Sequence, residues 1–490
     1  MDRARPAVPA STSSFVDPRG PYLIPLLLLA IARLLAWSQL PLASEDAYIT
    51  FRYAQNLAAG HGLVYNLGEK VMGFTSPLWT VWCAVGSLLG DPVSWSRLTS
   101  VAADVVTLVC VGRLLERQAG RSAAWCFTFF FAAWPYFSAV AVSGMEISLM
   151  LALLALAAAT LERPGPAAGV ALGLLALTRP EGVVAALVLA PGARRAHLLL
   201  GGAILLGGLL ALTATFGSPL PQSVIAKSSL YGTPGPWQGR FWWEWLVPFR
   251  LGPWTDIGDL NMLIPIAVVW AAALVPGVAV LARAPRSPLA LAAAAGIVVW
   301  LGYALLGVAY FYWYLALPLV GLTIVAATGL PRLTRGRALY ATMILSVVGT
   351  WTLARFLYLG RAEAESLSFA RIAGELRQRA HAGESVMLEP IGIIGFQNPL
   401  RVVDEIGLVS PRVAARRRGG AGWYADIAAA ERPDWLVVRR GVMTHGLAFA
   451  GRGAPFRDGA ERDSLLARYR ELPGQADNTA DQALILYRRR

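Results

Sequence analysis

Long runs of apolar residues dominate the first 360 positions of the chain and alternate with short polar or glycine- and proline-rich breaks. At about 1.5 Å per residue, a run of about 20 apolar residues crosses the roughly 30 Å hydrocarbon core of a bilayer. The pattern therefore predicts about eleven transmembrane helices. The predicted segments are 21–43, 76–90, 94–114, 122–141, 144–161, 167–191, 196–216, 260–283, 288–308, 309–330 and 338–358.

Two polar segments interrupt this series. The first outer loop, 44–76, opens with a predicted short helix from Ala47 to Leu57, for which Ser44 is a suitable N-cap. Ile49 and Tyr53 fall on one face of that helix, which suits a helix lying in the membrane interface. The second loop, 217–259, is rich in proline, glycine and tryptophan. Interfacial aromatic belts explain many such tryptophans, although aromatic faces also stack on sugar rings.

After residue 360 the composition changes to that of a soluble α/β domain, residues 361–490. We expect an amphipathic helix at 363–379, helices near 424–430 and 463–469, and a small mixed or parallel sheet. The predicted strands are 385–388, 401–404, 435–438 and 483–487. The Gly392–Gly395 stretch lacks the G-x-G-x-x-G pattern, which argues against a dinucleotide site. We expect this domain to shape an acceptor site or to pack over the catalytic mouth.

Arginines in the short turns predict the orientation of the helices. Those at 283–286 and 332–337 mark cytoplasmic loops, which makes the tail 1–20 cytoplasmic as well. The loops 44–76 and 217–259 and the domain 361–490 then share the outer side. The arginines at 113–121 fall outside if every apolar run crosses once. An alternative makes 76–90 re-entrant and splits 167–191 at Thr178–Gly182, and both schemes keep the key loops outside.

Composition agrees with a polytopic membrane protein. Of 490 residues, 56% are hydrophobic and 15% charged, with a mean hydropathy of +0.52, which excludes an ordinary soluble protein. The formal charge of +13 comes almost wholly from arginine in loops beside apolar runs, so nucleic acid is not the implied partner. Lysine occurs only at Lys70 and Lys227, which makes both candidates for a specific role.

The candidate chemistry starts with Glu45 and Asp46, two adjacent carboxylates where the first apolar run ends. In the first turn of a helix, the dipole favours the ionised, proton-accepting form of a carboxylate. A purely capping role for the pair is about equally compatible with the spacing. No Walker loop, H-E-x-x-H, D-x-D or Cys/His cluster is present. Carboxylates, aromatics and isolated cations at a membrane surface suit group transfer from a lipid-linked donor.

Charges inside apolar runs also need an explanation, because each is costly unless it is paired or hydrated. Arg33 and Asp104 are suited to a structural pair. Arg179 and Glu181 are compatible with a helix end at the interface. Glu146 either has a structural role or faces the donor cavity.

The segments Asp46–Asn66 and Gly73–Trp79 resemble the first outer loop of GT-C glycosyltransferases, in particular the terminal arabinofuranosyltransferases of mycobacterial cell-wall synthesis. Thr178–Gly182, Pro219–Pro221 before Lys227, and Asp404–Leu408 resemble further elements of that group. Met72 departs from the pattern, since relatives often carry Glu there. The resemblance implies a GT-C fold, a polyprenyl-phosphate sugar as donor, and an acidic base in the first outer loop.

Residue roles follow from this resemblance. Asp46 matches the base, with Glu45 as the second acid. Lys227 is the preferred cation for the donor phosphate, and Arg52, Lys70 and Arg240 are alternatives. The expected substrate-binding residues are Tyr53, His61, Trp79, Glu146 and Trp242, although a turn role suits His61 better. No metal ligand set is predicted, but family members differ in metal use, so a divalent cation, Mg²⁺ or Mn²⁺, stays open at Glu45 and Asp46.

The sequence thus predicts an inverting glycosyltransferase of the bacterial inner (plasma) membrane, with its active site and C-terminal domain extracytoplasmic. Its expected partners are a polyprenyl-phosphate sugar donor, a cell-envelope glycan or glycolipid acceptor, and membrane lipid. Arabinofuranose or another pentose is the first expectation for the sugar. The alternatives are a hexose or aminosugar transferase acting on lipid A, O-antigen or protein, and a lipid-sugar transporter without catalysis. Transporters usually carry internal repeats, and none is evident here.

Overall fold

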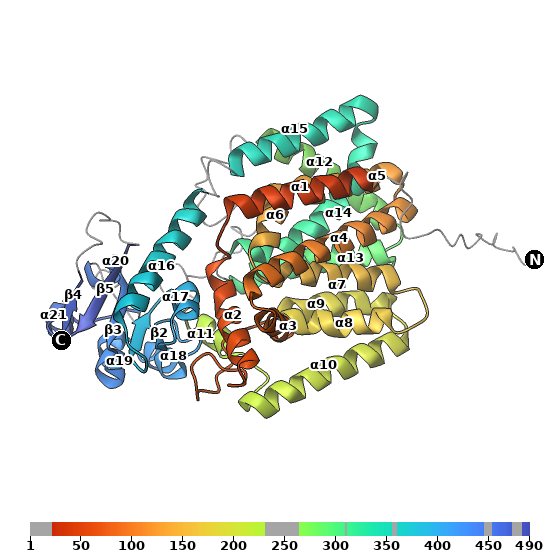
Figure 1. The fold of residues 1–490 in the computed structure, drawn as a ribbon. Coiled ribbons are helices and arrows are strands. Elements are labelled where there is room, and N and C mark those ends of the chain that lie inside the picture. The colour runs from red at the N-terminus through yellow and green to blue at the C-terminus, as the bar shows by residue number, and fades with distance from the viewer. Residues whose placement is uncertain (1–21, 231–263, 309–310, 355–359, 445–452, 473–482) are drawn as a thin grey trace, which may run out of the picture.

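The structure, a computed structural model, describes residues 22–230, 264–308, 311–354, 360–444, 453–472 and 483–490. Figure 1 shows a bundle of helices on the right and an α/β part on the left, with α2 (Glu45–Ala58), α3 (Pro77–Leu88) and α11 (Gln222–Leu230) near the junction. The helices of the first predicted apolar run, 21–43, and of the last, 338–358, both lie in this bundle. The chain is therefore a polytopic α-helical membrane protein with a C-terminal α/β part.

Every predicted apolar run contains at least one helix among the described residues. The bundle helices are α1 (Leu23–Gln39), α3 (Pro77–Leu88), α4 (Pro92–Gln118), α5 (Arg121–Ala133), α6 (Pro135–Val142), α7 (Ile147–Thr160), α8 (Ala167–Thr178), α9 (Pro180–Leu189), α10 (Arg195–Phe216), α12 (Ile264–Leu281), α13 (Pro288–Leu306), α14 (Ala316–Leu333) and α15 (Gly336–Ala354). The short turns η1 (Ala190–Gly192) and η4 (Tyr312–Leu315) follow α9 and precede α14.

Not all of these helices span a bilayer alone. By length and composition, four of the described ones do: α4, α10, α13, and α14 taken with η4. The α5–α6 pair, bent by 53° at Pro135, makes a fifth. Proline or glycine breaks shorten other apolar runs, so several helices, α3 among them, have only 10–17 residues. The predicted count of about eleven crossings therefore includes segments too short to cross unaided.

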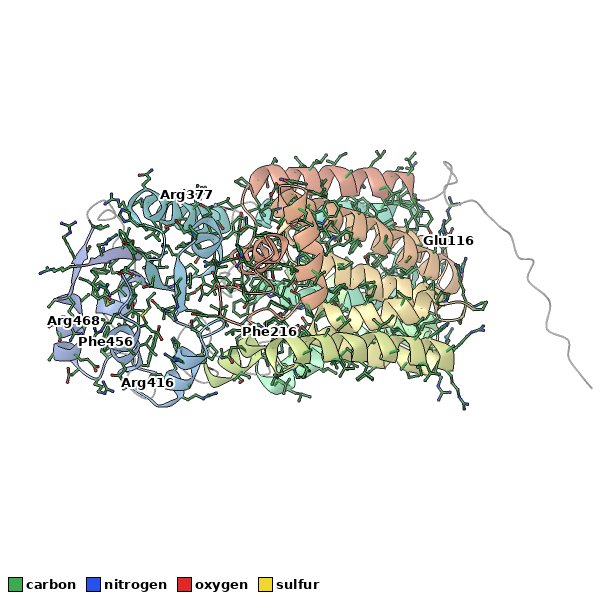
Figure 2. The ribbon with its side chains drawn as sticks, turned by 60° about the horizontal axis from the view of Figure 1, so that its bottom comes forward. Glu116, Phe216, Arg377, Arg416, Phe456 and Arg468 are labelled. Carbon is green, nitrogen blue, oxygen red and sulfur yellow. The ribbon has the colours of Figure 1, made fainter. Side chains whose placement is uncertain are left out.

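The structure agrees with the second topology scheme. The Tyr22 hydroxyl donates to Glu116 Oε2 at 3.0 Å, which places the start of α1 and the end of α4 at one end of the bundle. Figure 2 shows Glu116 at the end away from the α/β part. The arginines at 113–121 therefore share the side of residue 22. The run 167–191 is broken at Arg179, between α8 and α9, as that scheme predicted.

Arg33 and Asp104 form the predicted buried pair. Arg33 Nη2 lies 2.7 Å from Asp104 Oδ2, and both side chains are at most 2% exposed. The remaining guanidinium donors reach Ser138 Oγ at 3.1 Å and the carbonyls of Phe131 and Ala132. Every face of this charge is thus hydrogen-bonded, which ties α1 to α4, α5 and α6.

The first outer loop forms helix α2 (Glu45–Ala58), close to the predicted range. Ser44 occupies the N-cap position as expected, although its side chain makes no capping hydrogen bond. The expectation that α2 lies in the open interface is wrong, because the helix packs against α3 and against α17 (Gly392–Gln397) of the α/β part. Ile49 and Tyr53 are consequently buried.

The α/β part contains a five-stranded mixed sheet of order β2-β1-β3-β5-β4. Strands β2, β1 and β3 are parallel, while β5 is antiparallel to both β3 and β4. The strands are β1 (Ser385–Leu388), β2 (Arg401–Asp404), β3 (Trp435–Arg439), β4 (Tyr469–Glu471) and β5 (Leu484–Arg489). Four of them match predictions, whereas β4 lies where the helix at 463–469 was expected to end. The other helices are α16 (Gly360–Arg379), α18 (Pro411–Arg418), α19 (Trp423–Glu431), α20 (Arg440–Thr444) and α21 (Gly459–Leu466).

Alternation along the strands gives the sheet two different faces. Val386 and Leu388 of β1 join a core that is continuous with the bundle, whereas Met387 faces a separate core with α19 and α21. One face of the sheet therefore shares a core with the membrane part, and α17 packs directly on α2.

Candidate functional site

A cavity of about 450 Å³, a volume that includes open solvent, lies where the bundle meets the α/β part. Its walls come from segments far apart in the sequence. They are Asp46, Ile49, Thr50, Gly73, Phe74, Thr75, Ser76, Met145, Glu146, Arg179, Ser223, Lys227, Trp313 and Leu408.

Asp46 enters this cavity from the first turn of α2. Burial raises the pKa of Asp46 above its ordinary value, while Lys227 and Arg179 lower it and Glu389 raises it further. A carboxylate with a raised pKa is a stronger proton acceptor once ionised, and the two cations keep the ionised form accessible. Asp46 therefore has the position and the electrostatics of a general base.

The loop before α7 brings Glu146 to the cavity that Asp46 borders. The Ser44 N–H donates to Ser143 O at 2.8 Å, which joins the start of α2 to this loop. Gly144 has φ +81° and packs within 3.0 Å of the Phe51 ring, measured from where a Cβ would stand, so a side chain there would be strained and crowded. Trp79, fully buried, donates Nε1–H to Gly144 O at 3.0 Å. Trp79 thus supports the wall rather than lining the cavity.

Arg179 lies between two carboxylates on the cavity wall. Its Nη1 pairs with Glu146 Oε1 and its Nε pairs with Glu181 Oε1. The guanidinium also lies 5.4 Å above the Tyr314 ring. Sequence reasoning treated Arg179 as marking a helix end, and it does sit at the α8–α9 break, but the break also turns its side chain toward Asp46.

Lys227 reaches the cavity from α11 (Gln222–Leu230). The start of α11 is fixed to the first loop, because the Gln222 N–H donates to Met72 O at 2.8 Å. The Gln222 side chain donates to Gly407 O at 3.1 Å, which adds the Asp404–Leu408 motif to the same junction. Lys227 Nζ lies 5.3 Å from the centre of the Phe311 ring, a cation–π distance. Lys227 is partly buried and borders the cavity, while its role as a phosphate ligand stays a prediction.

Three other predicted site residues lie behind the cavity wall. Both carboxylate oxygens of Glu45 accept backbone N–H groups, from Gly392 and Ile393 of α17. Burial raises the pKa of Glu45 to about 8, while these two N–H groups lower it. Arg52 donates to the carbonyls of Gly395 and Leu400, each at 2.7 Å.

The Tyr53 hydroxyl donates to Val71 O at 2.6 Å and accepts the Gly73 N–H at 2.9 Å. Tyr53 therefore shapes the 71–73 turn, and Arg52 holds the loop to the α/β part. Neither borders the cavity, so their predicted contacts with phosphate and substrate have no support from the geometry.

The remaining predicted residues lie elsewhere. His61 and Lys70 are exposed on the first loop and are not among the cavity-lining residues. Arg240 and Trp242 fall outside the described residues. Of the predicted site residues that the structure describes, the cavity brings together Asp46, Glu146 and Lys227.

Comparison with known proteins gives a consistent result. Residues 357–485 match a domain of unknown function (DUF8728). The chain is 32% identical over 143 residues to the terminal beta-(1->2)-arabinofuranosyltransferase of Mycobacterium tuberculosis (strain ATCC 25618 / H37Rv), a match that covers 27% of this chain and 23% of that protein. The chain therefore matches about a quarter of the length of this curated relative.

Among solved structures, ArnT from Cupriavidus metallidurans bound to undecaprenyl phosphate superimposes with a TM-score of 0.62 at 13% identity, covering 96% of this chain and 98% of ArnT. The mycobacterial arabinofuranosyltransferase AftD superimposes with a TM-score of 0.51 at 16% identity, covering 95% of this chain and 40% of AftD. The chain has the GT-C fold.

The described carboxylates do not form a set that fits Mg²⁺ or Mn²⁺ in this GT-C chain. Among the described residues, no three His, Cys, Asp or Glu side chains gather as metal ligands. Glu45, one of the two predicted ligands, already uses both oxygens on backbone N–H groups. Divalent cations need several oxygen ligands together. A metal requirement stays a prediction.

Several cavity residues were not predicted from the sequence. Arg179, Ser223 and Trp313 come from three different elements that only the fold brings to Asp46. A charge between Thr178 and Pro180 at a break in an apolar run was the available signal for Arg179, because irregular backbone at membrane depth usually lines a cavity. Ser223 and Trp313 carried no comparable signal.

Proposed function

We propose that this chain is a membrane glycosyltransferase that moves a sugar from a polyprenyl-phosphate donor to a cell-envelope glycan or glycolipid. The observation that carries the proposal is the cavity at the junction, where Asp46 meets two cations, Lys227 and Arg179. A base and two cations that line one cavity match the needs of a displacement at a sugar phosphate. The GT-C fold and the similarity to an arabinofuranosyltransferase support the same class of reaction.

The proposed reaction is an inverting displacement. Asp46 removes the proton from an acceptor hydroxyl as that oxygen attacks the anomeric carbon of the donor sugar. The new carbon–oxygen bond forms while the bond from the anomeric carbon to the phosphate oxygen breaks. Polyprenyl phosphate leaves with the bonding electron pair, and the proton stays on Asp46 until solvent takes it. A positioned base of this kind typically contributes about 10² to 10⁴ in rate.

The departing phosphate gains negative charge, and Lys227 is its proposed partner. Lys227 is a compact cation on a flexible stem, and its helix α11 is fixed at its first residue, so it can approach a phosphate without moving the wall. Arg179, held between Glu146 and Glu181, contributes a directed but largely compensated charge. ArnT, which shares the fold, is seen bound to undecaprenyl phosphate, and this supports a polyprenyl-phosphate donor here.

For the sugar, we propose arabinofuranose or another pentose, on the strength of the matched segment of the mycobacterial relative. Transfer of a hexose or aminosugar to lipid A, O-antigen or protein is the second candidate within the class. The α/β part borders the cavity through Leu408, so we propose that it forms part of the acceptor site. We further propose that the cavity and this part face the extracytoplasmic side of a bacterial inner membrane.

The test is sugar transfer in proteoliposomes from a panel of polyprenyl-phosphate sugars. Wild type is compared with Asp46→Asn and with Asp91→Asn as a matched control. Asp91 is an exposed N-cap that accepts the Val93 and Ser94 N–H groups and is not among the cavity-lining residues, and asparagine caps equally well. We expect Asp46→Asn to lose about 10²-fold or more in kcat, while Asp91→Asn transfers normally.

Normal transfer by Asp46→Asn would remove Asp46 as the base. Movement of the lipid-linked sugar across the vesicle membrane without any transfer would instead favour the transporter alternative.

A further inference from the structure

Glu45 is adjacent to the proposed base but faces away from the cavity. Successive helix residues point about 100° apart, so the two side chains of this first turn diverge. Asp46 borders the cavity, whereas the Glu45 carboxylate accepts the Gly392 N–H at Oε1 and the Ile393 N–H at Oε2, the latter at 2.9 Å. The carboxylate thus joins the first turn of α2 to the first turn of α17.

The contact between α2 and α17 is too close for side chains. A Cβ at Gly392 would stand 1.9 Å from the Glu45 carbonyl oxygen, and one at Gly395 would stand 2.0 Å from the Tyr65 hydroxyl. Gly392 is therefore required by the close approach of the α2 backbone, and Gly395 by the Tyr65 hydroxyl that packs against it. The Gly392–Gly395 stretch, which lacks a nucleotide-binding pattern, instead lets α17 pack closely on the first loop.

Further hydrogen bonds hold both ends of α17. The Tyr65 hydroxyl donates to Ile391 O, at the N-cap, at 2.5 Å, and Arg52 donates to Gly395 O and Leu400 O, near and beyond the C-terminal end. The Arg52 guanidinium also stacks 4.3 Å from the centre of the Tyr65 ring. Both ends of α17 are held, and this leaves the first turn of α2 little freedom to rotate.

We propose that Glu45 is a positioning residue, through which the α/β part fixes the orientation of Asp46. This inference rests on the proposed function, because it assumes that Asp46 is the base. Glu45 neither takes the substrate proton nor binds a metal ion, since both of its oxygens are occupied on the side away from the cavity. The α/β part is then a component of the catalytic machinery as well as a candidate acceptor surface. A shift of about 1 Å in a catalytic group can lower a rate about 10²-fold.

The experiment uses the full chain in proteoliposomes and two changes on the contact, Glu45→Gln and Gly392→Ala. Glutamine keeps the size of the side chain but turns an NH₂ toward one of the two N–H donors. Alanine pushes α17 from α2 without altering any charge. We expect each change to lower kcat at least tenfold and to leave the donor KM within about twofold, because Lys227 and the cavity wall are unchanged.

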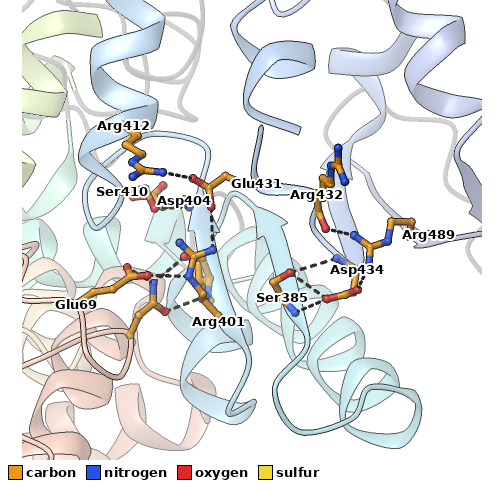
Figure 3. Close-up of polar contacts among 12 residues, drawn as sticks. Glu69, Ser385, Arg401, Asp404, Ser410, Arg412, Glu431, Arg432, Asp434 and Arg489 are labelled. Atoms are coloured by element: carbon orange, nitrogen blue, oxygen red, sulfur yellow. Dashed lines mark hydrogen bonds and ion pairs between the residues drawn. The ribbon is translucent and has the colours of Figure 1, made fainter. Parts of the chain in front are cut away.

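Two matched controls separate this contact from general loosening. Glu69 pairs with Arg401 at 2.7 Å, as Figure 3 shows, and so also joins the first loop to the α/β part, but its side chain is 32% exposed. Glu69→Gln is expected to keep kcat within about twofold, because exposed pairs contribute little. Gly374→Ala lies on α16, where an added Cβ meets nothing within 4 Å, and is also expected to be neutral.

A double-mutant cycle distinguishes positioning from a separate role. If Glu45 acts only through Asp46, Glu45→Gln adds no further loss to Asp46→Asn. The proposal would be overturned if the double variant lost kcat by the product of the two single losses. It would also be overturned if the fall in kcat equalled the loss of folded protein measured by thermal unfolding.

The same variants distinguish a failure of the positioning role of Glu45 from a failure of the proposed function. If Asp46→Asn abolishes transfer while Glu45→Gln and Gly392→Ala transfer normally, the positioning role fails alone. If Asp46→Asn transfers as well as wild type, the proposed function fails first. If Glu45→Gln folds poorly, Gly392→Ala carries the test without a change of charge.

Discussion

Two groups of buried charges in the bundle look alike in sequence but differ in their surroundings. Arg33 and Asp104 are enclosed by α1, α4, α5 and α6, and backbone carbonyls satisfy the rest of the guanidinium. Arg179 is paired as closely, with Glu146 and Glu181, yet Arg179 and Glu146 border the cavity beside Asp46. Both groups avoid an unpaired charge at membrane depth. Only the Arg179 group borders a cavity and can contact a ligand.

This difference gives a rule for interpreting charges in apolar runs. A pair whose donors are all used on protein atoms is structural, because no ligand can exchange for those partners without cost. A pair that borders a cavity can trade part of its interactions for a substrate. The two groups should therefore respond differently to substitution. Changes at the Arg33 group should lower the stability of the fold, whereas changes at the Arg179 group should lower the rate of transfer.

The largest expected effect comes from Asp104→Asn. Removing the charge leaves the Arg33 guanidinium buried and uncompensated, which costs about 3–5 kcal/mol for pairs of this kind. We expect a much lower unfolding midpoint in detergent and a lower yield of folded protein. The protein that does fold should keep the wild-type donor KM.

The double change Arg33→Met with Asp104→Leu is the matched control. Apolar replacement of a whole buried pair is often neutral or stabilising. We expect this double variant to recover most of the lost stability. A double variant as unstable as Asp104→Asn would show that the pair is needed for packing rather than for charge balance.

The second effect is kinetic. Arg179→Lys keeps a positive charge but loses the planar fork that pairs with Glu146 and Glu181 at once. We expect kcat/KM for the donor to fall about 10- to 100-fold, with the unfolding midpoint nearly unchanged, because the cavity supplies water to the shorter side chain. Steady-state transfer and thermal unfolding measure the two quantities separately.

Arg33→Lys is the counterpart of Arg179→Lys on the enclosed pair. It should lower stability and leave the kinetic constants of the folded protein unchanged. The comparison fails if the two Arg→Lys variants behave alike.

Much of the fold followed from the apolar pattern because a membrane segment has no alternative to a helix. Helix α10 was predicted to within a residue at its start, and strands β1 and β2 match residue for residue, since each holds consecutive buried apolar residues, Val386–Leu388 and Val402–Val403. Strand β4, Tyr469–Glu471, was missed because three residues at a sheet edge are too few to show an alternation of apolar and polar positions. Helix α2 was predicted in range but not in environment, since its second partner, α17, lies more than 300 residues later.

The candidate site was predicted in part. Asp46 and Lys227 were each found beside recognisable loop motifs, and the structure brings them to one cavity. The sequence could not separate Asp46 from Glu45, because adjacent carboxylates look equivalent until a partner takes one of them. Arg52 shows a related difficulty. It was a candidate phosphate ligand as a cation in the first loop, but its guanidinium donates to four backbone carbonyls.

The smallest effect is a shift in pH dependence, and it compares two charges that act on Asp46 in opposite directions, Lys227 and Glu389. Asp46 must be ionised to accept a proton, and burial raises its pKa, so transfer should fall as the pH drops through a value above the usual carboxyl pKa of about 4. Lys227 lowers the pKa of Asp46, so Lys227→Met should move this acid limb to higher pH. Glu389 raises the same pKa, so Glu389→Gln should move the limb to lower pH.

A shift of about one pH unit corresponds to about 1.4 kcal/mol, within reach of one neighbouring charge in a partly dehydrated cavity. The rate of transfer measured from pH 4 to 9 for the three proteins gives the limbs directly. Lys227→Met should also lower the plateau rate, because it removes a partner of the departing phosphate, whereas Glu389→Gln should leave the plateau near wild type. Shifts of the same sign in both variants would mean that the limb belongs to a group other than Asp46, and the base would then have to be sought elsewhere on the cavity wall, with Glu146 as the next carboxylate to test.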